Sequence, residues 1–164
     1  MKLFRSYESL ARRERITLFT LISLTALSLA FIFYNSLLPP AASGEESAAV
    51  GGFLSLLLPE GAWITEFILE NLRSLAHFAE FFVLGALTAA MIHLFSYKPA
   101  VLIFPSVVFG LLVGFFDETV QIFSGRGPEI VDVWVDTLGY LTATLAVLLI
   151  WLIARRIQGK EKGK

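Results

Sequence analysis

Four long apolar stretches alternate with polar segments along this 164-residue chain. A helix rises about 1.5 Å per residue, so about 20 apolar residues cross the ~30 Å hydrocarbon core of a membrane. The pattern therefore predicts an all-α fold, a bundle of four transmembrane helices. We expect the spans at residues 16–38, 74–95, 100–116 and 131–154.

The first apolar run, residues 16–38, follows a basic start, which is also the pattern of a signal peptide. A signal peptide has an apolar core of only about 7–15 residues before a small-residue cleavage site. The run here is longer, which favours a retained first span, although the small residues 41–43 would suit cleavage. The proline pair at 39–40 should end this helix.

Between the first two spans the pattern changes twice. Residues 41–52 are small and include glycine, which predicts a loop. Between Glu60 and Arg73 apolar residues recur at helical spacing, with charged residues between them, as in an amphipathic helix. Trp63 suits a membrane interface. We therefore expect residues 60–73 to form an extra amphipathic helix that lies on the membrane surface or packs as a linker.

Composition agrees with a membrane protein. The chain is 56% hydrophobic and 16% charged, whereas a soluble domain carries about 25% charged residues. Its length allows one membrane domain over residues 1–164 and no separate soluble domain. The net charge of −1 gives no indication of a nucleic-acid partner, and the lack of cysteine excludes disulfides and thiolate metal ligands.

Lysine and arginine are unevenly distributed along the chain. Eleven of the thirteen lie in the N-terminal arm, the turn at Lys98 and the C-terminal tail. With four spans these three segments lie on one side, which the positive-inside rule identifies as the cytoplasm. We therefore expect a multi-pass protein of the cell membrane with both termini cytoplasmic, and with Arg73 and Arg126 on the outer side.

Polar residues within the predicted spans occur in pairs near the outer side. The members of each pair are three or four residues apart and so share one face of a helix. A charge costs about 2.5–3.5 kcal/mol at the centre of a spanning helix, so these faces should meet in one outward-facing pocket and avoid lipid. The candidates are His77 with Glu80, Glu118 with Gln121, Asp132 with Asp136, and Arg126 on the loop between the last two pairs.

These side chains allow several kinds of chemistry. One imidazole and several carboxylates suit a divalent cation such as Mg²⁺, Mn²⁺ or Zn²⁺, and a carboxylate or the imidazole could act as a general base. Arg126 could hold a phosphate or a carboxylate. We expect Glu118 and His77 to form the central pair, with Asp132 orienting Arg126. The candidate metal ligands are His77, Glu80, Glu118, Asp132 and Asp136.

The same residues also have purely structural explanations. A hydrogen bond between His77 and Glu80 would fix a helix pair, and Asp132 would suit the start of a helix. Glu118 and Arg126 would form an ion pair that holds the loop.

Three blocks of residues lie between about residues 73 and 142. They are Arg73, His77, Glu80 and Gly85; then Asp117, Glu118, Gln121, Gly125 and Arg126; then Asp132, Asp136 and Gly139. In their order and spacing these blocks resemble the VanZ-like family. Ser74, Phe81 and Ser124 depart from the lysine, tyrosine and proline usual in the family. The resemblance implies a role in the cell envelope, since the founding member is associated with resistance to teicoplanin, but it supplies no reaction.

Two classes of function follow. The first is an enzyme that performs metal-assisted or acid–base hydrolysis or transfer on a lipid-linked or cell-wall precursor at the outer face. The second is a non-catalytic protein that binds lipid or peptide, or a small transporter, with the same pocket.

Overall fold

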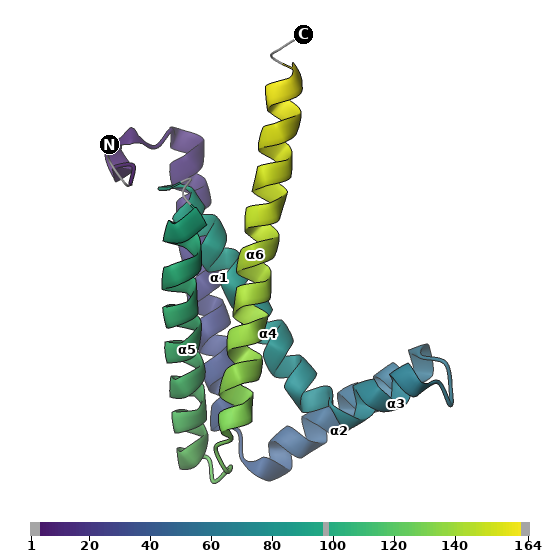
Figure 1. Ribbon diagram of the computed structural model, residues 1–164. Coiled ribbons are helices and arrows are strands. Elements are labelled where there is room, and N and C mark those ends of the chain that lie inside the picture. The colour runs from purple at the N-terminus through teal and green to yellow at the C-terminus, as the bar shows by residue number, and fades with distance from the viewer. Residues whose placement is uncertain (1–3, 97–98, 162–164) are drawn as a thin grey trace.

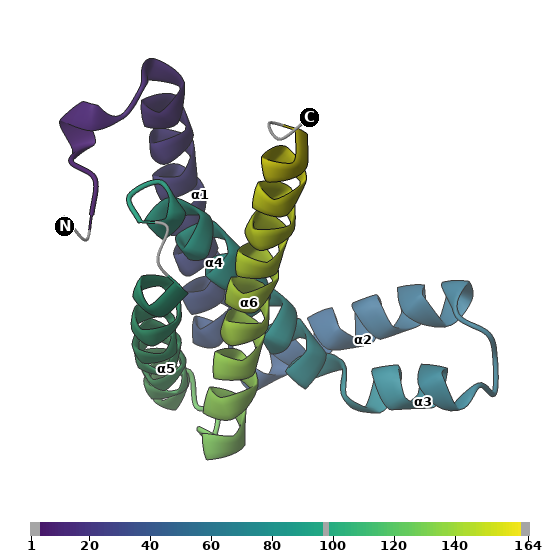
Figure 2. The same cartoon turned by 45° about the horizontal axis from the view of Figure 1, so that its top comes forward.

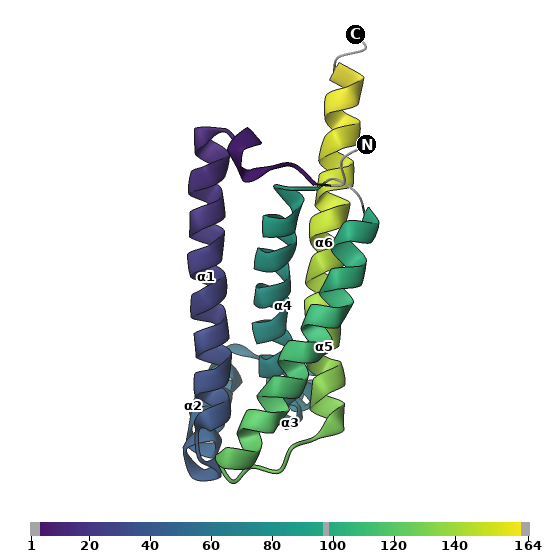
Figure 3. The ribbon, with the colours of Figure 1, turned by 90° about the vertical axis from the view of Figure 1, so that its left-hand side faces the viewer.

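The computed structural model describes residues 4–96 and 99–161, which form six α-helices after a short 3-10 turn and contain no strand. Helices α1, α4, α5 and α6 are each long and apolar enough to span a membrane. They lie side by side in one bundle (Figures 1 and 3), which confirms the predicted all-α fold with four spans. The helices are α1 (Arg12–Leu37), α2 (Pro40–Leu57), α3 (Trp63–Glu70), α4 (Leu72–His93), α5 (Pro99–Phe123) and α6 (Ile130–Glu161).

Large apolar side chains cover the outside of the bundle. Phe104 is 73% exposed, and Phe31 and Leu149 are each more than half exposed. An apolar surface of this extent suits lipid and not water. The buried core is small and draws on all four spans through Ile32, Phe81, Leu84, Val113 and Tyr140.

Two glycines allow α4 and α6 to cross at very short distance. A Cβ atom on Gly139 would lie 3.1 Å from the carbonyl carbon of Phe78, and one on Gly85 would lie 2.9 Å from the Cα of Tyr140. Small residues at such crossings let helix backbones approach closely in membranes. The crossing fixes α4 against α6 within a few residues of His77 and Asp136.

Helices α2 and α3 form a hairpin that projects sideways from one end of the bundle (Figures 1 and 2). The predicted loop at residues 41–52 is therefore wrong, because α2 runs through it. Pro40 is at the first helical turn, where proline is tolerated, and several alanines favour helix. The predicted helix at 60–73 is confirmed over the shorter range of α3, since residues 59–62 form a turn and Arg73 belongs to α4.

Helix α5 is longer than the predicted third span, which was expected to end at residue 116. It continues to Phe123 and is followed by Gly125, whose φ is +78°. The charges at Asp117 and Glu118 do not end the helix because both side chains are buried, that of Asp117 in the bundle and that of Glu118 against the 124–129 loop. The loop between α5 and α6 is therefore limited to residues 124–129.

The start of α1 and the end of α6 lie at the same end of the bundle, while the 124–129 loop and the hairpin lie at the other (Figure 1). The N–H of Arg5 donates to the carbonyl of Phe95 at 2.8 Å, which ties the N-terminal arm to the end of α4. The predicted orientation, with both termini in the cytoplasm, requires that the start of α1 and the end of α6 lie at one end of the bundle, as they do. Several basic residues behind that prediction lie outside the described residues, namely Lys2, Lys98, Lys162 and Lys164.

Candidate functional site

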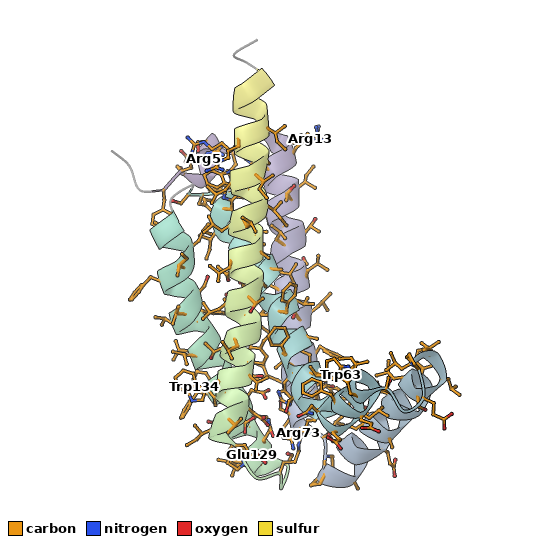
Figure 4. All side chains as sticks on the ribbon, turned by 45° about the vertical axis from the view of Figure 1, so that its right-hand side comes forward. Arg5, Arg13, Trp63, Arg73, Glu129 and Trp134 are labelled. Carbon is orange, nitrogen blue, oxygen red and sulfur yellow. The ribbon has the colours of Figure 1, made fainter. Side chains whose placement is uncertain are left out.

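Buried polar side chains gather at the end of the bundle opposite the termini. Figure 4 marks this end by Arg73 and Glu129, and the other end by Arg5 and Arg13. The predicted candidates all belong to this end, where they are joined by contacts among four helices and the 124–129 loop. We call this group the polar cluster: Asn35, Ser36, Arg73, His77, Glu80, Asp117, Glu118, Gln121, Arg126, Asp132 and Asp136.

His77 contacts two aspartates at the centre of the polar cluster. Its Nδ1 atom lies 3.3 Å from Oδ1 of Asp136 and 3.7 Å from Oδ2 of Asp117. From the sequence, Glu118 was predicted to form the central pair with His77, and Asp117 was not among the candidates for the pocket. The difference arises because α5 continues as a helix, so that residue 117 faces the bundle while residue 118 faces the loop.

Glu118 holds the loop through hydrogen bonds. Its carboxylate accepts the side-chain N–H of Gln121 and the backbone N–H of Glu129, each at 2.6 Å. Among the described residues it forms no ion pair with Arg126. Glu118 therefore joins α5 to the start of α6.

Helix α1 supplies two residues that the sequence analysis missed. Asn35 donates to Oε1 of Glu80 at 2.9 Å, and the Ser36 hydroxyl donates to Oδ1 of Asp117. Gln121 donates to the other oxygen of Asp117 at 3.0 Å. Asn35 and Ser36 are adjacent polar residues near the C-terminal end of the first apolar run. They lie at the same end of the bundle as the predicted candidates, and this position was the signal that could have identified them. Glu80 is thus bound to α1, and the structure shows no hydrogen bond from it to His77 within the described residues.

The Asp136 carboxylate is buried without hydrogen bonds. Asp136 is 0% exposed, and neither of its carboxylate oxygens nor Nδ1 of His77 has a hydrogen-bond partner among the described residues. A Cβ atom on Gly114 would lie 3.2 Å from the Cβ of Asp136, so the glycine leaves room for this carboxylate. Burying a polar group without a hydrogen bond costs about 1–3 kcal/mol by mutational measurements.

Two arginines lie on the open side of the polar cluster. Arg73 donates to Oε1 of Gln121 at 2.8 Å and lies 3.6 Å from Oδ2 of Asp132. Arg126 donates to the carbonyl of Asn35 at 3.0 Å. The prediction that Asp132 orients Arg126 is therefore wrong, because Asp132 lies beside Arg73 and forms no bond with Arg126 among the described residues. Burial and the nearby Arg73 lower the pKa of the Arg126 guanidinium below its usual value, so an anion bound between the two arginines would be stabilised by both.

A cavity of about 460 Å³ opens beside the polar cluster, between α1, α2 and α4. Its polar wall includes His77, Glu80, Arg73 and Arg126, and a neighbouring cavity of about 350 Å³ shares the two arginines. The other predicted candidates, Glu118, Gln121, Asp132 and Asp136, do not line it. Its apolar wall consists of Phe31, Tyr34, Ala49, Val50, Leu72 and Ala76. The cavity is therefore amphiphilic.

Carboxylates outnumber basic groups in the polar cluster. The acids are balanced only by two arginines and by His77 if it is protonated. Like charges this close disfavour full ionisation, so protons or a bound cation must offset them. The acids are Glu80, Asp117, Glu118, Asp132 and Asp136.

One subset of the polar cluster has the spacing of metal ligands. Atoms of His77, Asp117 and Asp136 all lie within 4.8 Å of one another. Two of these residues were predicted ligands, and Asp117 is new. Glu118 is instead occupied by two N–H donors and Asp132 lies beside Arg73.

Comparison with known proteins identifies the family. No curated protein and no solved structure gives a significant match to the chain. The family model described as VanZ/LLP1 matches residues 19–153, well over half of the chain and beyond the 73–142 expected from the motifs. The match includes every member of the polar cluster, those on α1 among them. This chain is a membrane protein that belongs to the VanZ/LLP1 family.

Proposed function

We propose that the chain is a cell-envelope enzyme that hydrolyses or transfers the phosphate group of a lipid-linked precursor at the outer face of the cell membrane. The observation that carries this proposal is the amphiphilic cavity of about 460 Å³, where two arginines and Glu80 adjoin an apolar wall. A lipid-linked phosphate has the same division into an anionic head and an apolar chain.

The arginines would bind the phosphate. Arginine presents a planar fork of N–H donors that matches phosphate oxygens, and such charge-assisted hydrogen bonds are about twice as strong as neutral ones. Arg73 has a side chain that is 41% exposed, so it is accessible from the cavity. Phe31, Val50 and Leu72 would contact the hydrocarbon chain.

Glu80 would act as the general base. It lines the cavity, and Asn35 holds one of its oxygens. As the oxygen of water or of an acceptor hydroxyl bonds to phosphorus, Glu80 takes its proton and the bond from phosphorus to the leaving oxygen breaks. The protonated Glu80 then gives this proton to the leaving oxygen, which restores its carboxylate, and the arginines stabilise the charge that develops on the phosphoryl oxygens.

The proposal requires that the polar cluster faces the outside of the cell, with both termini in the cytoplasm. The chain has no cysteine, so single-cysteine variants report their own position only. Gly127→Cys lies on the exposed 124–129 loop and Arg13→Cys lies exposed at the opposite end. A membrane-impermeant thiol reagent should label the first in intact cells and the second only after lysis, and the reverse pattern would exclude the proposed orientation.

A second function is favoured by one observation. Arg73, Gln121 and Glu118 are already bonded to one another in the structure, as in a site that holds a ligand without reacting with it. In that case the chain would be a non-catalytic binder of lipid or peptide, or a small transporter, and it would act in glycopeptide resistance by sequestering or moving a precursor.

The deciding experiment uses the full chain in detergent micelles with a polyprenyl diphosphate as probe. We expect binding and release of inorganic phosphate. Arg73→Gln should weaken binding about 10-fold or more, as for the loss of a charged hydrogen bond. Glu80→Gln should keep binding and reduce release by about 100-fold or more.

Matched controls are Arg13→Gln and Glu45→Gln, which change exposed residues that do not line the cavity and should behave as the wild type. Binding without phosphate release would support the second function. An absence of binding, or equal release by Glu80→Gln and wild type, would refute the proposed reaction.

A further inference from the structure

We infer that His77, Asp117 and Asp136 bind one divalent cation of the zinc type beneath the amphiphilic cavity. The three residues come from α4, α5 and α6, so the site exists only when these helices are packed together. The role of the ion in catalysis rests on the proposed function, whereas its binding rests on the geometry alone.

The two distances from His77 to the aspartates are close to those between ligands of one four-coordinate ion, and all three ligand atoms lie within 4.8 Å of one another. Zinc binds nitrogen and oxygen ligands at about 2.0–2.2 Å in a tetrahedral arrangement, which places neighbouring ligand atoms about 3.3–3.6 Å apart. Nδ1 of His77 lies 3.3 Å from an oxygen of Asp136 and 3.7 Å from an oxygen of Asp117. An ion could be accommodated with little movement of the backbone.

The ligand atoms of His77 and Asp136 lie 3.3 Å apart and form no hydrogen bond among the described residues. Both oxygens of Asp136 and Nδ1 of His77 are buried and lack hydrogen bonds among the described residues, and Asp136 is fully buried. A buried carboxylate that neither donates nor accepts a hydrogen bond is rare in folded proteins. One cation would satisfy Nδ1 of His77 and one oxygen of Asp136, and would offset the excess of carboxylates around them.

The surrounding residues hold the ligands in place. Ser36 and Gln121 donate to the two oxygens of Asp117, and Gly114 leaves the space that Asp136 occupies. Such outer hydrogen bonds orient metal ligands and typically change metal affinity about 10–100-fold when removed. The support that Ser36 gives Asp117 explains why this serine of α1 is buried.

The ligand set favours zinc among divalent cations. One imidazole and two carboxylates are three protein ligands, and catalytic zinc sites leave the fourth position for water or substrate. Magnesium prefers about six oxygens in an octahedral arrangement and keeps several waters. Because His77 also lines the cavity, the fourth position would be accessible to a bound headgroup.

The test measures metal content without any lipid substrate. The full chain, purified in detergent and freed of any affinity tag, is stripped with EDTA, dialysed against zinc and analysed by mass spectrometry of the metal. We expect about one zinc per chain and a higher melting temperature with zinc than with EDTA. Asp136→Asn and Asp117→Asn should lose the ion.

Two further variants keep the test decisive if an aspartate variant fails to fold. Ser36→Ala removes only a supporting hydrogen bond and should weaken zinc binding about 10-fold or more, while Glu129→Gln changes an exposed acid and should bind zinc as the wild type does. The inference would be overturned if the wild type bound no zinc at a saturating zinc concentration, or if Ser36→Ala and Asp136→Asn bound zinc with wild-type affinity. Retention of magnesium or manganese in place of zinc would overturn the assignment of the ion. A protein that binds zinc but no polyprenyl diphosphate would uphold this site and refute the proposed function.

Discussion

Helices α4 and α6 meet in two places, and their buried polar atoms have different surroundings in each. At the glycine crossing, the hydroxyl groups of Thr88 and Tyr140 are hydrogen-bonded to each other, and Thr88 also donates to the carbonyl of Leu84 at 2.9 Å. At the polar cluster, the atoms of His77 and Asp136 that face each other lack hydrogen bonds among the described residues. The atoms compared at both places are buried.

This difference in hydrogen bonding distinguishes polar groups that are buried to stabilise the fold from polar groups that are buried for function. The crossing shows that this bundle can pair buried hydroxyl groups, although the hydroxyl of Thr25 is buried without a partner elsewhere. The polar cluster differs because its unpaired atoms include both oxygens of a carboxylate, which is far more costly to bury than a hydroxyl. Burial of unpaired groups lowers stability, and proteins retain such arrangements mainly at sites that bind or react. The crossing therefore stabilises the fold, whereas the unpaired atoms of the polar cluster lower its stability.

The largest expected effect is at the crossing. Gly139→Ala should lower the free energy of unfolding by about 1–3 kcal/mol, because the added Cβ would meet the backbone of Phe78 and force the helices apart. Gly44→Ala is the matched control, since no atom lies within 4 Å of the added Cβ and alanine favours helix by up to about 1 kcal/mol. Unfolding in detergent measures both, and equal effects of the two variants would show that the close crossing is unimportant.

A smaller effect is expected from the hydroxyl pair at the same place. Thr88→Val alone should destabilise by about 1–2 kcal/mol, because it leaves the Tyr140 hydroxyl buried without its partner. The double variant Thr88→Val with Tyr140→Phe should be less destabilised than the sum of the single changes. Strict additivity in the double-mutant cycle would show that the two hydroxyls do not interact.

The smallest effect on stability is expected at the loop side of the polar cluster. Glu118→Gln keeps the shape of the side chain and an oxygen that can accept from Gln121 or Glu129, and it removes one of five neighbouring acids. Because the loss of one acceptor oxygen and the relief of repulsion oppose each other, we expect a change in unfolding free energy of at most about 1 kcal/mol. Phosphate release should fall, because the 124–129 loop that carries Arg126 loses part of its attachment to α5. A folded Glu118→Gln protein with wild-type phosphate release would assign Glu118 a structural role only.

The fold was largely predictable because span number depends on length and hydrophobicity, which are local properties of the chain. The errors in the predicted fold came from local sequence signals that tertiary structure overrides. The charges at Asp117 and Glu118 resembled the end of a span, yet they are buried in α5. The small residues of α2 resembled a loop, although alanine and a first-turn proline are compatible with helix.

The polar cluster was predictable as a set of helix faces but not as a set of partners. Spacing indicated which residues share a face of one helix, and this was sufficient to predict that His77 and Asp136 belong to the polar cluster. Partners depend on the rotation of each helix about its axis, which decides that Asp117 meets His77 and that Asp132 meets Arg73. Ser36 was missed because a single hydroxyl hardly changes the hydrophobicity of a span.

The most direct test of this account compares the melting temperatures of wild type and Asp136→Asn in EDTA, with Glu45→Gln, an exposed site on α2, as control. If Asp136 is an uncompensated carboxylate kept for function, its replacement by a neutral amide should raise the melting temperature by a few degrees, while added zinc should stabilise only the wild type. The control should match wild type. A lower melting temperature for Asp136→Asn in EDTA would contradict the account, because it would show that Asp136 stabilises the fold as the ion-pair partner of a protonated His77.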